Sequence, residues 1–309
     1  MKEELLRLFN SSTEEFYAFF CKATSLRFSH FKDKLETCGI LNAKSGKCPS
    51  DCKFCTQSRH FKVEVKEYPL MSKGELVKVA LEAFSKGINR FSFVTSGVSP
   101  TPKELQEIGA AVEELKSKDP SVKVCASLGQ LTEEQLRFLK SCGLDRYHHN
   151  LETSREFYPK VATLQRWEDR YATVAKAKEV GLSTCCGGIF GLGEGVEDIY
   201  SLALSLKELE VDSVPVNFLH PIKGTPLEKA NYLTPLKSLK VLVALRLLLP
   251  DKEIRVCGGR EYNLQELQPL ALLVADSLMV GNYLTTKGRN LKDDELLIKN
   301  LGLKSTLRV

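Results

Sequence analysis

Short β-rich runs alternate with amphipathic stretches along this chain of 309 residues, and this alternation restricts the fold more than any other feature. The predicted strands are Glu36–Leu41, Arg90–Thr95, Val122–Leu128, Arg146–Leu151, Ser183–Phe190, Ser213–Phe218, Glu253–Val256 and Ser277–Val280. Helical patterns lie between them at Lys73–Lys86, Pro102–Ser117, Thr132–Ser141, Trp167–Val180, Val196–Leu209, Pro235–Leu249 and Leu264–Val274. This order predicts a parallel α/β fold, a (β/α)8 TIM-type barrel, with an open doubly wound sheet as the alternative.

The same pattern divides the chain into two parts. Residues 1–34 are predicted to form an N-terminal helical extension, with a helix from Lys2 to about Lys22. Residues 35–309 are predicted to form the barrel domain. In a barrel or an open sheet, functional side chains are expected inside or at the carboxyl ends of the strands.

Charge and hydropathy exclude several kinds of partner. The net charge of +5 comes from basic residues dispersed among acids, which predicts a solvated surface and no nucleic-acid partner. No apolar run has the length of a membrane span, and Met1–Arg7 contains acids without an apolar core, so neither a membrane partner nor a secretory signal is predicted. We therefore expect a cytoplasmic protein whose ten cysteines are ligands or buried thiols, not disulfides.

Three of these cysteines stand close together after the first predicted strand. Cys48, Cys52 and Cys55 have the spacing C-x3-C-x2-C. Cysteine runs of this kind hold Fe–S clusters. Three thiolates on one loop can bind three irons of a four-iron, four-sulfur cluster and leave the fourth iron open to a substrate. Phe54, next to the third cysteine, is placed to shield such a cluster or simply to pack.

The alternatives for this loop are a zinc site and a redox pair. A structural zinc site needs four ligands, but no fourth cysteine follows at a zinc-ribbon distance and the nearest histidine is His60. Cys52 and Cys55 alone form a CxxC pair, which normally opens a helix in a thioredoxin-like unit. The third cysteine favours the open cluster over both alternatives.

Polar side chains lie at the end of the fourth predicted strand. Alternation places His148, Asn150 and Glu152 on one face, which favours a polar ligand site over buried structural side chains. The glycine-rich run Gly187–Glu194 closes the fifth strand. Its spacing is not that of a dinucleotide fingerprint, so it allows either close backbone approach to a ligand or a tight strand-to-helix turn.

Further cysteines fall inside or at the ends of strands. Cys125 and Cys257 each have the environment of a small buried hydrophobe, and of Cys185 and Cys186 at most one easily faces a barrel interior. Arg255 shares a face with Cys257, and a buried arginine needs a compensating partner. Together these residues make a second metal site plausible. The cysteines without such a pattern are predicted to be structural: Cys21, Cys38 and Cys142.

In combination, these motifs resemble those of the radical S-adenosylmethionine enzymes and, among them, the biotin synthases. The C-x3-C-x2-C motif marks the superfamily, and the resemblance extends from about Leu35 to Leu303. The runs that carry it at the family level are Tyr147–Ser154, Cys186–Glu194, Val214–Leu219, Lys223–Leu227, Gly259–Glu261 and Leu284–Thr286.

The resemblance implies roles for individual residues. The predicted catalytic positions are Cys48, Cys52 and Cys55, which would bind the four-iron cluster that chelates S-adenosylmethionine, and Arg255. Contacts to this cofactor site are implied for Phe54, Asn150, Glu152, Gly187, Ile189, Gly191 and Glu194. Contacts to dethiobiotin are implied for His148, Asn150, Asn217 and Thr285. Cys125, Cys185 and Arg255 match ligands of an auxiliary Fe–S cluster, the expected sulfur donor.

The chain departs from the family pattern around this auxiliary cluster. Ser92 stands where the well-known members have a further cysteine ligand, and Cys257 stands where a small residue other than cysteine is expected. His148 replaces an asparagine that contacts substrate. We therefore expect a ligand set in which Cys257 joins Cys125, Cys185 and Arg255, around a cluster of two irons or more, with Ser92 and Cys186 as alternative ligands.

The resemblance implies sulfur insertion into dethiobiotin by 5′-deoxyadenosyl radical chemistry. It further implies a flavodoxin or ferredoxin as electron donor, and a homodimer. Two other functions stay open on the residues alone. One is a radical enzyme of a neighbouring barrel subfamily with another small substrate, and the other is a metal-binding scaffold without enzymatic activity.

Overall fold

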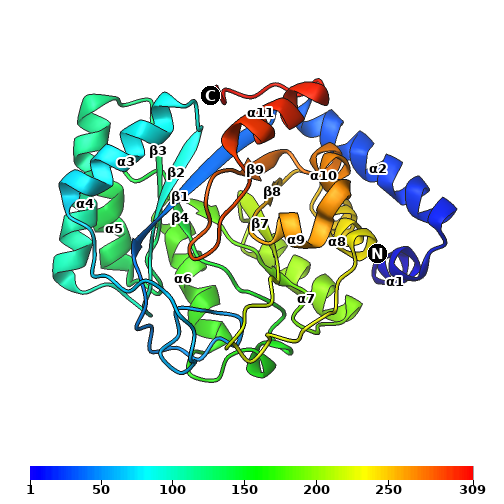
Figure 1. Cartoon of the computed structure of the whole chain (residues 1–309), viewed down its shortest axis with the longest axis horizontal. Helices are drawn as coiled ribbons and strands as arrows, with labels where there is room; N and C mark the ends of the chain where they lie inside the picture. The colour runs from blue at the N-terminus through cyan, green and yellow to red at the C-terminus, as the bar shows by residue number, and fades with distance from the viewer. Residues whose placement is uncertain (309) are drawn as a thin grey trace.

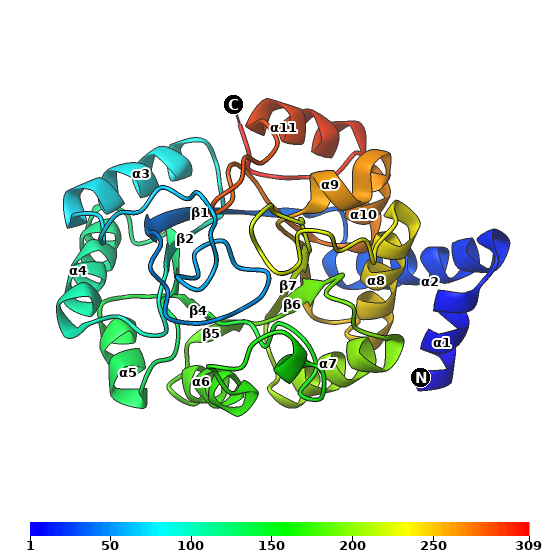
Figure 2. The ribbon, with the colours of Figure 1, turned by 60° about the horizontal axis from the view of Figure 1, so that its bottom comes forward.

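The strands of the computed structural model, which describes residues 1–308, pair in parallel and close into a barrel (Figures 1 and 2). They are β1 (Glu36–Lys44), β2 (Arg90–Thr95), β3 (Lys123–Ser127), β4 (Arg146–His148), β5 (Ser183–Cys185), β6 (Gly188–Phe190), β7 (Ser213–Phe218), β8 (Glu253–Val256) and β9 (Ser277–Met279). Their order is β5-β4-β3-β2-β1-β9-β8-β7-β6, and a β5–β7 pairing at Cys185 and Ser213 closes the ring. The predicted (β/α)8 barrel is confirmed, and the sheet is not open.

Strands β5 and β6 share one of the eight barrel positions. The sequence predicts a continuous strand over Ser183–Phe190, but the ladder with β7 is interrupted after Cys185. Pro215 on β7 has no N–H to donate at this height of the sheet. Gly187 instead accepts hydrogen bonds from the backbone N–H groups of Leu151 and Glu152, at 3.1 and 3.2 Å. The break therefore ties the end of the fourth barrel strand to the fifth.

Helices surround the barrel (Figure 2). They are α1 (Lys2–Asn10), α2 (Thr13–Phe31), α3 (Lys73–Ser85), α4 (Pro102–Lys118), α5 (Glu133–Ser141), α6 (Trp167–Glu179), α7 (Val196–Glu208), α8 (Pro235–Leu248), α9 (Arg260–Leu264), α10 (Gln268–Val274) and α11 (Leu291–Asn300). Side-chain caps explain where several begin: Ser72 and Thr132 form capping boxes, and Thr234 accepts from the backbone N–H of Lys237. Among residues 1–308, no helix combines the length and hydrophobicity of a membrane span.

Three helical predictions need correction. The N-terminal helix is two helices, because Ser12 forms a capping box with Glu15 and starts α2, which runs on to Phe31. The stretch Leu264–Val274 is divided, because α10 starts afresh at Gln268 with a proline in its first turn. Helix α11 was not predicted from the sequence.

The carboxyl ends of the strands form the functional mouth of the barrel. The long segment between β1 and α3, residues 45–72, contains the cysteine loop and passes across this mouth in Figure 2. The alternation of side chains along the strands leaves one set pointing into the barrel and one set packed against the helices. Residues of both the cysteine loop and the barrel interior therefore meet at one place.

Candidate active site

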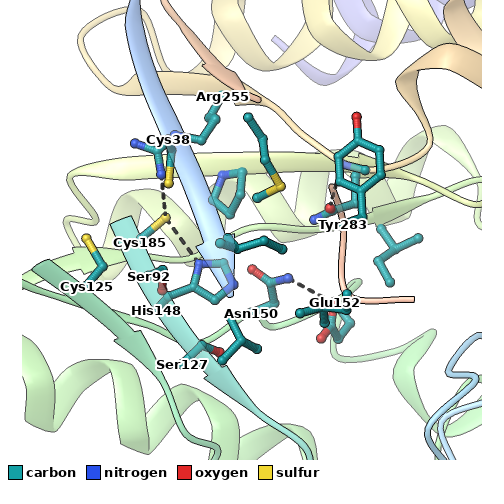
Figure 3. A pocket seen from close by; sticks show the side chains of 18 of the residues that line it. Cys38, Ser92, Cys125, Ser127, His148, Asn150, Glu152, Cys185, Arg255 and Tyr283 are labelled. Atoms are coloured by element: carbon teal, nitrogen blue, oxygen red, sulfur yellow. Dashed lines mark hydrogen bonds between the residues drawn. The ribbon is translucent and has the colours of Figure 1, made fainter. Parts of the chain in front are cut away.

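A cavity of about 320 Å³ fills the barrel interior below the cysteine loop (Figure 3). This volume lies at the small end of the range of about 300–1,000 Å³ that is usual for ligand pockets. Its wall is formed by residues of almost every strand together with Phe54 and the segment after β9. The lining residues predicted from the sequence are Phe54, Cys125, His148, Asn150, Glu152, Cys185, Ile189, Asn217, Arg255 and Thr285.

The mouth of the cavity is polar because the chain turns sharply after β4. Glu152 adopts a left-handed backbone conformation, with φ of 71°, that a residue other than glycine seldom takes. Asn150 donates to Glu152 Oε2 at 3.2 Å (Figure 3), and its own Oδ1 accepts from the backbone of Gly187 at 3.2 Å. These bonds hold both side chains at the cavity wall, as the alternation after β4 predicts.

Glu152 is buried beside a buried guanidinium. Burial raises the pKa of Glu152, and the positive charge of Arg170 opposes that shift. Arg170 lies 3.4 Å from Glu152 Oε1 and also donates to the backbone carbonyl of Asn150 at 3.0 Å. Arg170 on α6 therefore orients the polar end of the site, a role that the sequence motifs did not reveal.

Asn217 and Thr285 reach the cavity from two other elements. Asn217 on β7 accepts from the backbone N–H of Gly258 at 3.1 Å and donates to Gly188 O at 3.4 Å. Thr285, after β9, lies 2.9 Å from the hydroxyl of Thr56 on the cysteine loop. The structure therefore brings together the predicted substrate contacts from three separate parts of the sequence.

The glycine-rich run divides between the cavity wall and its support. Ile189 lines the cavity, whereas Gly187, Gly191 and Glu194 do not. Both carboxylate oxygens of Glu194 accept backbone N–H groups of the same loop, from Gly191 and Leu192 at 2.7 Å each. A Cβ on Gly187 would lie 2.1 Å from Pro215 O. Glu194 thus holds the backbone of this loop by hydrogen bonds, and Gly187 allows it to approach β7 closely.

Thiols gather at the deep end of the cavity. Cys125 on β3 and Cys185 on β5 both line it, as predicted. Cys185 Sγ lies 3.3 Å from His148 Nδ1 and 3.6 Å from an Arg255 nitrogen (Figure 3). Burial alone would raise the pKa of Cys185, but the charges of His148 and Arg255 bring it down to about 6. This thiol is therefore prepared to act as a thiolate ligand.

Arg255 is held by carboxylates at the amino-terminal end of the barrel. It pairs with Glu253 and lies 3.6 Å from Glu36 Oε2, while Arg146 pairs with Glu253 at 2.8 Å. Burial would raise the pKa of Glu253, but the charges of Arg255 and Arg146 keep it well below its ordinary value. The ion pairs compensate a guanidinium that is only 3% exposed.

The remaining residues of the predicted second site differ in whether they line the cavity. Ser92 lines the cavity and is the register partner of Cys125. Cys257 and Cys186 are fully buried but are not part of the cavity wall, and Cys257 Sγ makes a weak contact with Arg255 O at 3.5 Å. The structure adds a thiol that the sequence predicted to be structural. Cys38 on β1 lines the cavity near Arg255 (Figure 3).

The cysteine loop is fixed by backbone hydrogen bonds and by two positive-φ residues. Gly46 and Lys47, with φ of 81° and 53°, turn the chain before Cys48. The Cys48 N–H donates to Gln57 O at 2.9 Å, and that of Cys55 donates to Cys52 O at 2.9 Å. Ser50 Oγ lies 3.2 Å from Cys52 Sγ. The loop thus returns on itself, and these bonds fix the backbone that carries its three cysteines.

The donor set fits a cluster better than a single metal ion. No group of three or more His, Cys, Asp or Glu side chains in residues 1–308 is arranged to hold one ion. Burial, and then the neighbouring Cys52 thiol, raises the pKa of Cys55 to about 12, so its thiolate form needs a compensating cation. Three cysteine thiols on one loop are the kind of donor that holds an Fe–S cluster.

Comparisons with known proteins agree with these observations. The model described as the Radical SAM superfamily matches residues 43–206, and that of the Biotin and Thiamin Synthesis associated domain matches residues 215–304. The biotin synthase of Aquifex aeolicus (strain VF5) is 46% identical over 278 residues, which cover 90% of this chain and 84% of the relative. That of Sulfurihydrogenibium sp. (strain YO3AOP1) is 44% identical over 301 residues, with coverages of 97% and 90%.

Solved structures show the same fold at lower identity. Methylornithine synthase superposes with a TM-score of 0.84 at 19% identity, covering 99% of this chain and 94% of that protein. The FeFe-hydrogenase maturase of Carboxydothermus hydrogenoformans gives the same TM-score at 19% identity, covering 98% of this chain and 75% of the maturase. At such identities the likeness concerns the fold alone. The curated relatives, with the two domain matches, show that the chain belongs to the biotin synthase family of radical S-adenosylmethionine enzymes.

Proposed function

We propose that this chain converts dethiobiotin into biotin within the barrel cavity. The observation that carries the proposal is the placement of three groups of residues around one cavity: the cysteine loop at its mouth, polar side chains along its wall, and thiols with Arg255 at its deep end. When bound, the primary cluster and S-adenosylmethionine supply reductive sulfonium cleavage and hydrogen abstraction, and the auxiliary cluster supplies sulfur.

The residues at the mouth would hold the primary cluster and its ligand. Cys48, Cys52 and Cys55 are the proposed cluster ligands, and Phe54 extends from their loop into the cavity. Asn150 and Glu152 would bind S-adenosylmethionine with Ile189, on a backbone that Gly187, Gly191 and Glu194 shape. Since burial disfavours the charged form of Glu152, a cationic ligand beside it would be favoured in addition to Arg170.

The residues of the wall would orient dethiobiotin. His148, Asn150, Asn217 and Thr285 present a ring nitrogen, two amides and a hydroxyl to the same space, which suits the hydrogen-bonding groups of a ureido ring. The apolar part of the wall, with Ile40, Val94 and Met279, suits the hydrocarbon part of the substrate. Holding the reacting carbon in place and excluding water are the contributions of the protein itself.

The deep end would hold the auxiliary cluster. Cys125, Cys185 and Arg255 are the proposed ligands that line the cavity, and Cys257 is a proposed further thiolate from the strand that carries Arg255. We propose in addition that residues 1–34 are an extension of a barrel domain spanning 35–309. The enzyme would act in the cytoplasm as a homodimer, with a flavodoxin or ferredoxin as electron donor.

Product analysis tests this function. Anaerobically reconstituted protein, supplied with dithionite, S-adenosylmethionine and dethiobiotin, is expected to form biotin together with 5′-deoxyadenosine. A reaction that forms 5′-deoxyadenosine but no biotin would contradict the substrate and leave a radical enzyme of another kind. A protein that forms neither, with its clusters loaded, would contradict the function as a whole.

A further inference from the structure

We propose that Cys38 is a ligand of the auxiliary iron–sulfur cluster and supplies the thiolate that Ser92 lacks. The inference deepens the proposed function and rests on it, because it concerns the composition of the same deep site. It starts from an unexpected position: Cys38 lies near the amino end of β1, 3% exposed, and its side chain lines the cavity beside Arg255 (Figure 3).

Barrel geometry places Cys38 in one layer with the other deep residues. In a (β/α)8 barrel, the inward side chains of alternate strands form layers of four. With β5 and β6 counted as one position, Cys38, Cys125, Cys185 and Arg255 lie on the first, third, fifth and seventh strands. Cys38 therefore completes a layer of four inward groups that could not be closed without it.

Ser92 belongs to the second strand, and its side chain is therefore part of a layer formed by the even-numbered strands. Its register partner on β1 is Ile40, and Cys38 lies two residues before Ile40 on the same face. Cys38 therefore lies on the neighbouring strand, two residues closer to the amino end of the barrel than the register partner of Ser92. A thiolate is also the usual ligand of Fe–S clusters, whereas a serine hydroxyl is not.

The charges of these groups act on one another, in agreement with their common place at the deep end of the cavity. Burial raises the pKa of Cys38, the charge of Arg255 opposes this shift, and Cys185 reinforces it. Cys38 is likewise the largest contributor after burial to the raised pKa of Cys125. Cys185 contacts Arg255 at 3.6 Å. Cys38, Cys125, Cys185 and Arg255 thus line the same cavity, and Cys185 contacts the Arg255 guanidinium directly.

Cys257 differs from Cys38 in its access to this space. Both thiols are buried, but Cys38 lines the cavity, whereas Cys257 does not and makes a weak contact with Arg255 O. A cluster at the deep end of the cavity would therefore have Cys38 in the surrounding wall. The thiol of β1 is accordingly the first residue to test as a replacement for the missing ligand of β2.

Iron and sulfide counting tests the assignment without depending on catalysis. The parent is the full chain with Cys48, Cys52 and Cys55 replaced by alanine, so that only the auxiliary cluster forms on anaerobic reconstitution. Cys38→Ser and Cys38→Ala are introduced into this parent, and iron, acid-labile sulfide and visible absorption are measured. Even the loss of an outer-shell partner lowers metal affinity by about 10–100-fold, so the loss of a ligand should leave iron content well below that of the parent.

Two control variants show whether a loss of iron in the Cys38 variants reflects a lost ligand or only a change to a buried side chain. Cys142→Ser removes an equally buried thiol, at the end of α5 and away from the cavity, and is expected to keep the parent's iron and sulfide. Ser92→Ala removes the hydroxyl of β2 and is expected to keep them as well. Circular dichroism and thermal unfolding of each variant verify that the barrel has folded.

The outcomes distinguish this inference from the function on which it rests. Iron and sulfide at the parent level in folded Cys38→Ser, or their loss in Ser92→Ala alone, would overturn the role of Cys38 and leave the auxiliary site intact. A parent that binds no iron would overturn the auxiliary site and Cys38 with it.

Discussion

Asn217 illustrates how single residues serve both the barrel and its contents. Its amide accepts from the backbone of Gly258 and donates to that of Gly188, so its side chain is fixed between β6 and the loop after β8. It also lines the cavity. A side chain that is held by the protein before substrate arrives loses little further freedom on binding.

The first prediction concerns this residue. Asn217→Ala should weaken dethiobiotin binding by about 1–3 kcal/mol, because polar groups of the bound substrate would lose their partner. Binding of S-adenosylmethionine should change much less. Titration calorimetry with each ligand measures both effects, and Asn300→Ala, an exposed asparagine at the end of α11, is the control. Equal losses for the two ligands would place Asn217 outside the substrate site.

At the same scale, the sequence predicted that His148, Asn150 and Glu152 share one face, and all three line the cavity. The reason is not alternation alone, because β4 ends at His148 and the turn after it, with Glu152 at positive φ, brings the other two side chains to the wall. The place of Cys38 in the cavity wall was not predicted, because a single cysteine in a strand forms no motif. Its neighbours depend on which strands lie opposite β1 in the closed barrel. Arg170 was missed for a related reason, since only the packing of α6 brings it to Glu152.

Among the elements, the fifth barrel strand departs most from regular pairing. Gly187 lies where the ladder with β7 is interrupted between β5 and β6, and Gly188 is the first residue of β6. Both glycines face backbone atoms at close range. A Cβ on Gly188 would lie 2.3 Å from Glu152 O. This close approach positions the turn that carries Asn150 and Glu152 into the cavity.

The second prediction concerns Gly187, where an added Cβ would lie 2.1 Å from Pro215 O. Gly187→Ala should destabilise the protein by about 1–3 kcal/mol and weaken S-adenosylmethionine binding, because its Cβ would force apart the backbones of β7 and the interrupted strand. Urea unfolding and ligand titration measure the two effects. Gly74→Ala, in the first turn of α3 with open space around its Cβ, should leave stability unchanged or slightly increased. Normal stability and binding in Gly187→Ala would refute this account of the break.

The elements also show where sequence patterns fail. Several strands were predicted with the bounds that the structure has, for example Arg90–Thr95 and Ser213–Phe218. Helix α11 was not, because its buried residues are Asp294 and Ile298 and its pattern is mostly charged. It is anchored by an ion pair between Asp294 and the buried Arg260, at 2.7 Å, and such a tertiary contact has no local signature in the sequence.

On the scale of the whole molecule, the N-terminal helices are packed against the C-terminal half of the barrel. Helix α2 lies beside α8 and α10 (Figure 1). Arg27 on α2 is fully buried and donates to the backbone carbonyls of Ala275, Lys32 and Lys34. One side chain thus joins the extension to the segment before β9 and to the start of the barrel.

The third prediction tests this connection. Arg27→Ala should lower the free energy of unfolding by about 1–3 kcal/mol, because three carbonyl groups would lose their donor. Arg7→Ala, an exposed arginine 3.7 Å from Glu15, should stay within about 0.5 kcal/mol of the unmodified protein. Chemical unfolding of both variants provides the comparison. Equal stability of the two variants would contradict a stabilising role of Arg27 between the extension and the barrel.

The proposed radical chemistry requires an open cluster on the cysteine loop. Cys52, the middle ligand, is buried and hydrogen-bonded to Ser50, and a loop with two remaining thiolates cannot hold a cluster that has one open iron. Cys142→Ala is the control, since it removes a buried thiol far from the loop.

The most direct measurement is 5′-deoxyadenosine formation from S-adenosylmethionine under anaerobic conditions with dithionite. The unmodified chain and Cys142→Ala are expected to form this product, and Cys52→Ala is expected to form none. Cleavage by Cys52→Ala at close to the unmodified rate would contradict the central claim, because the loop would then not be the place where S-adenosylmethionine is reduced.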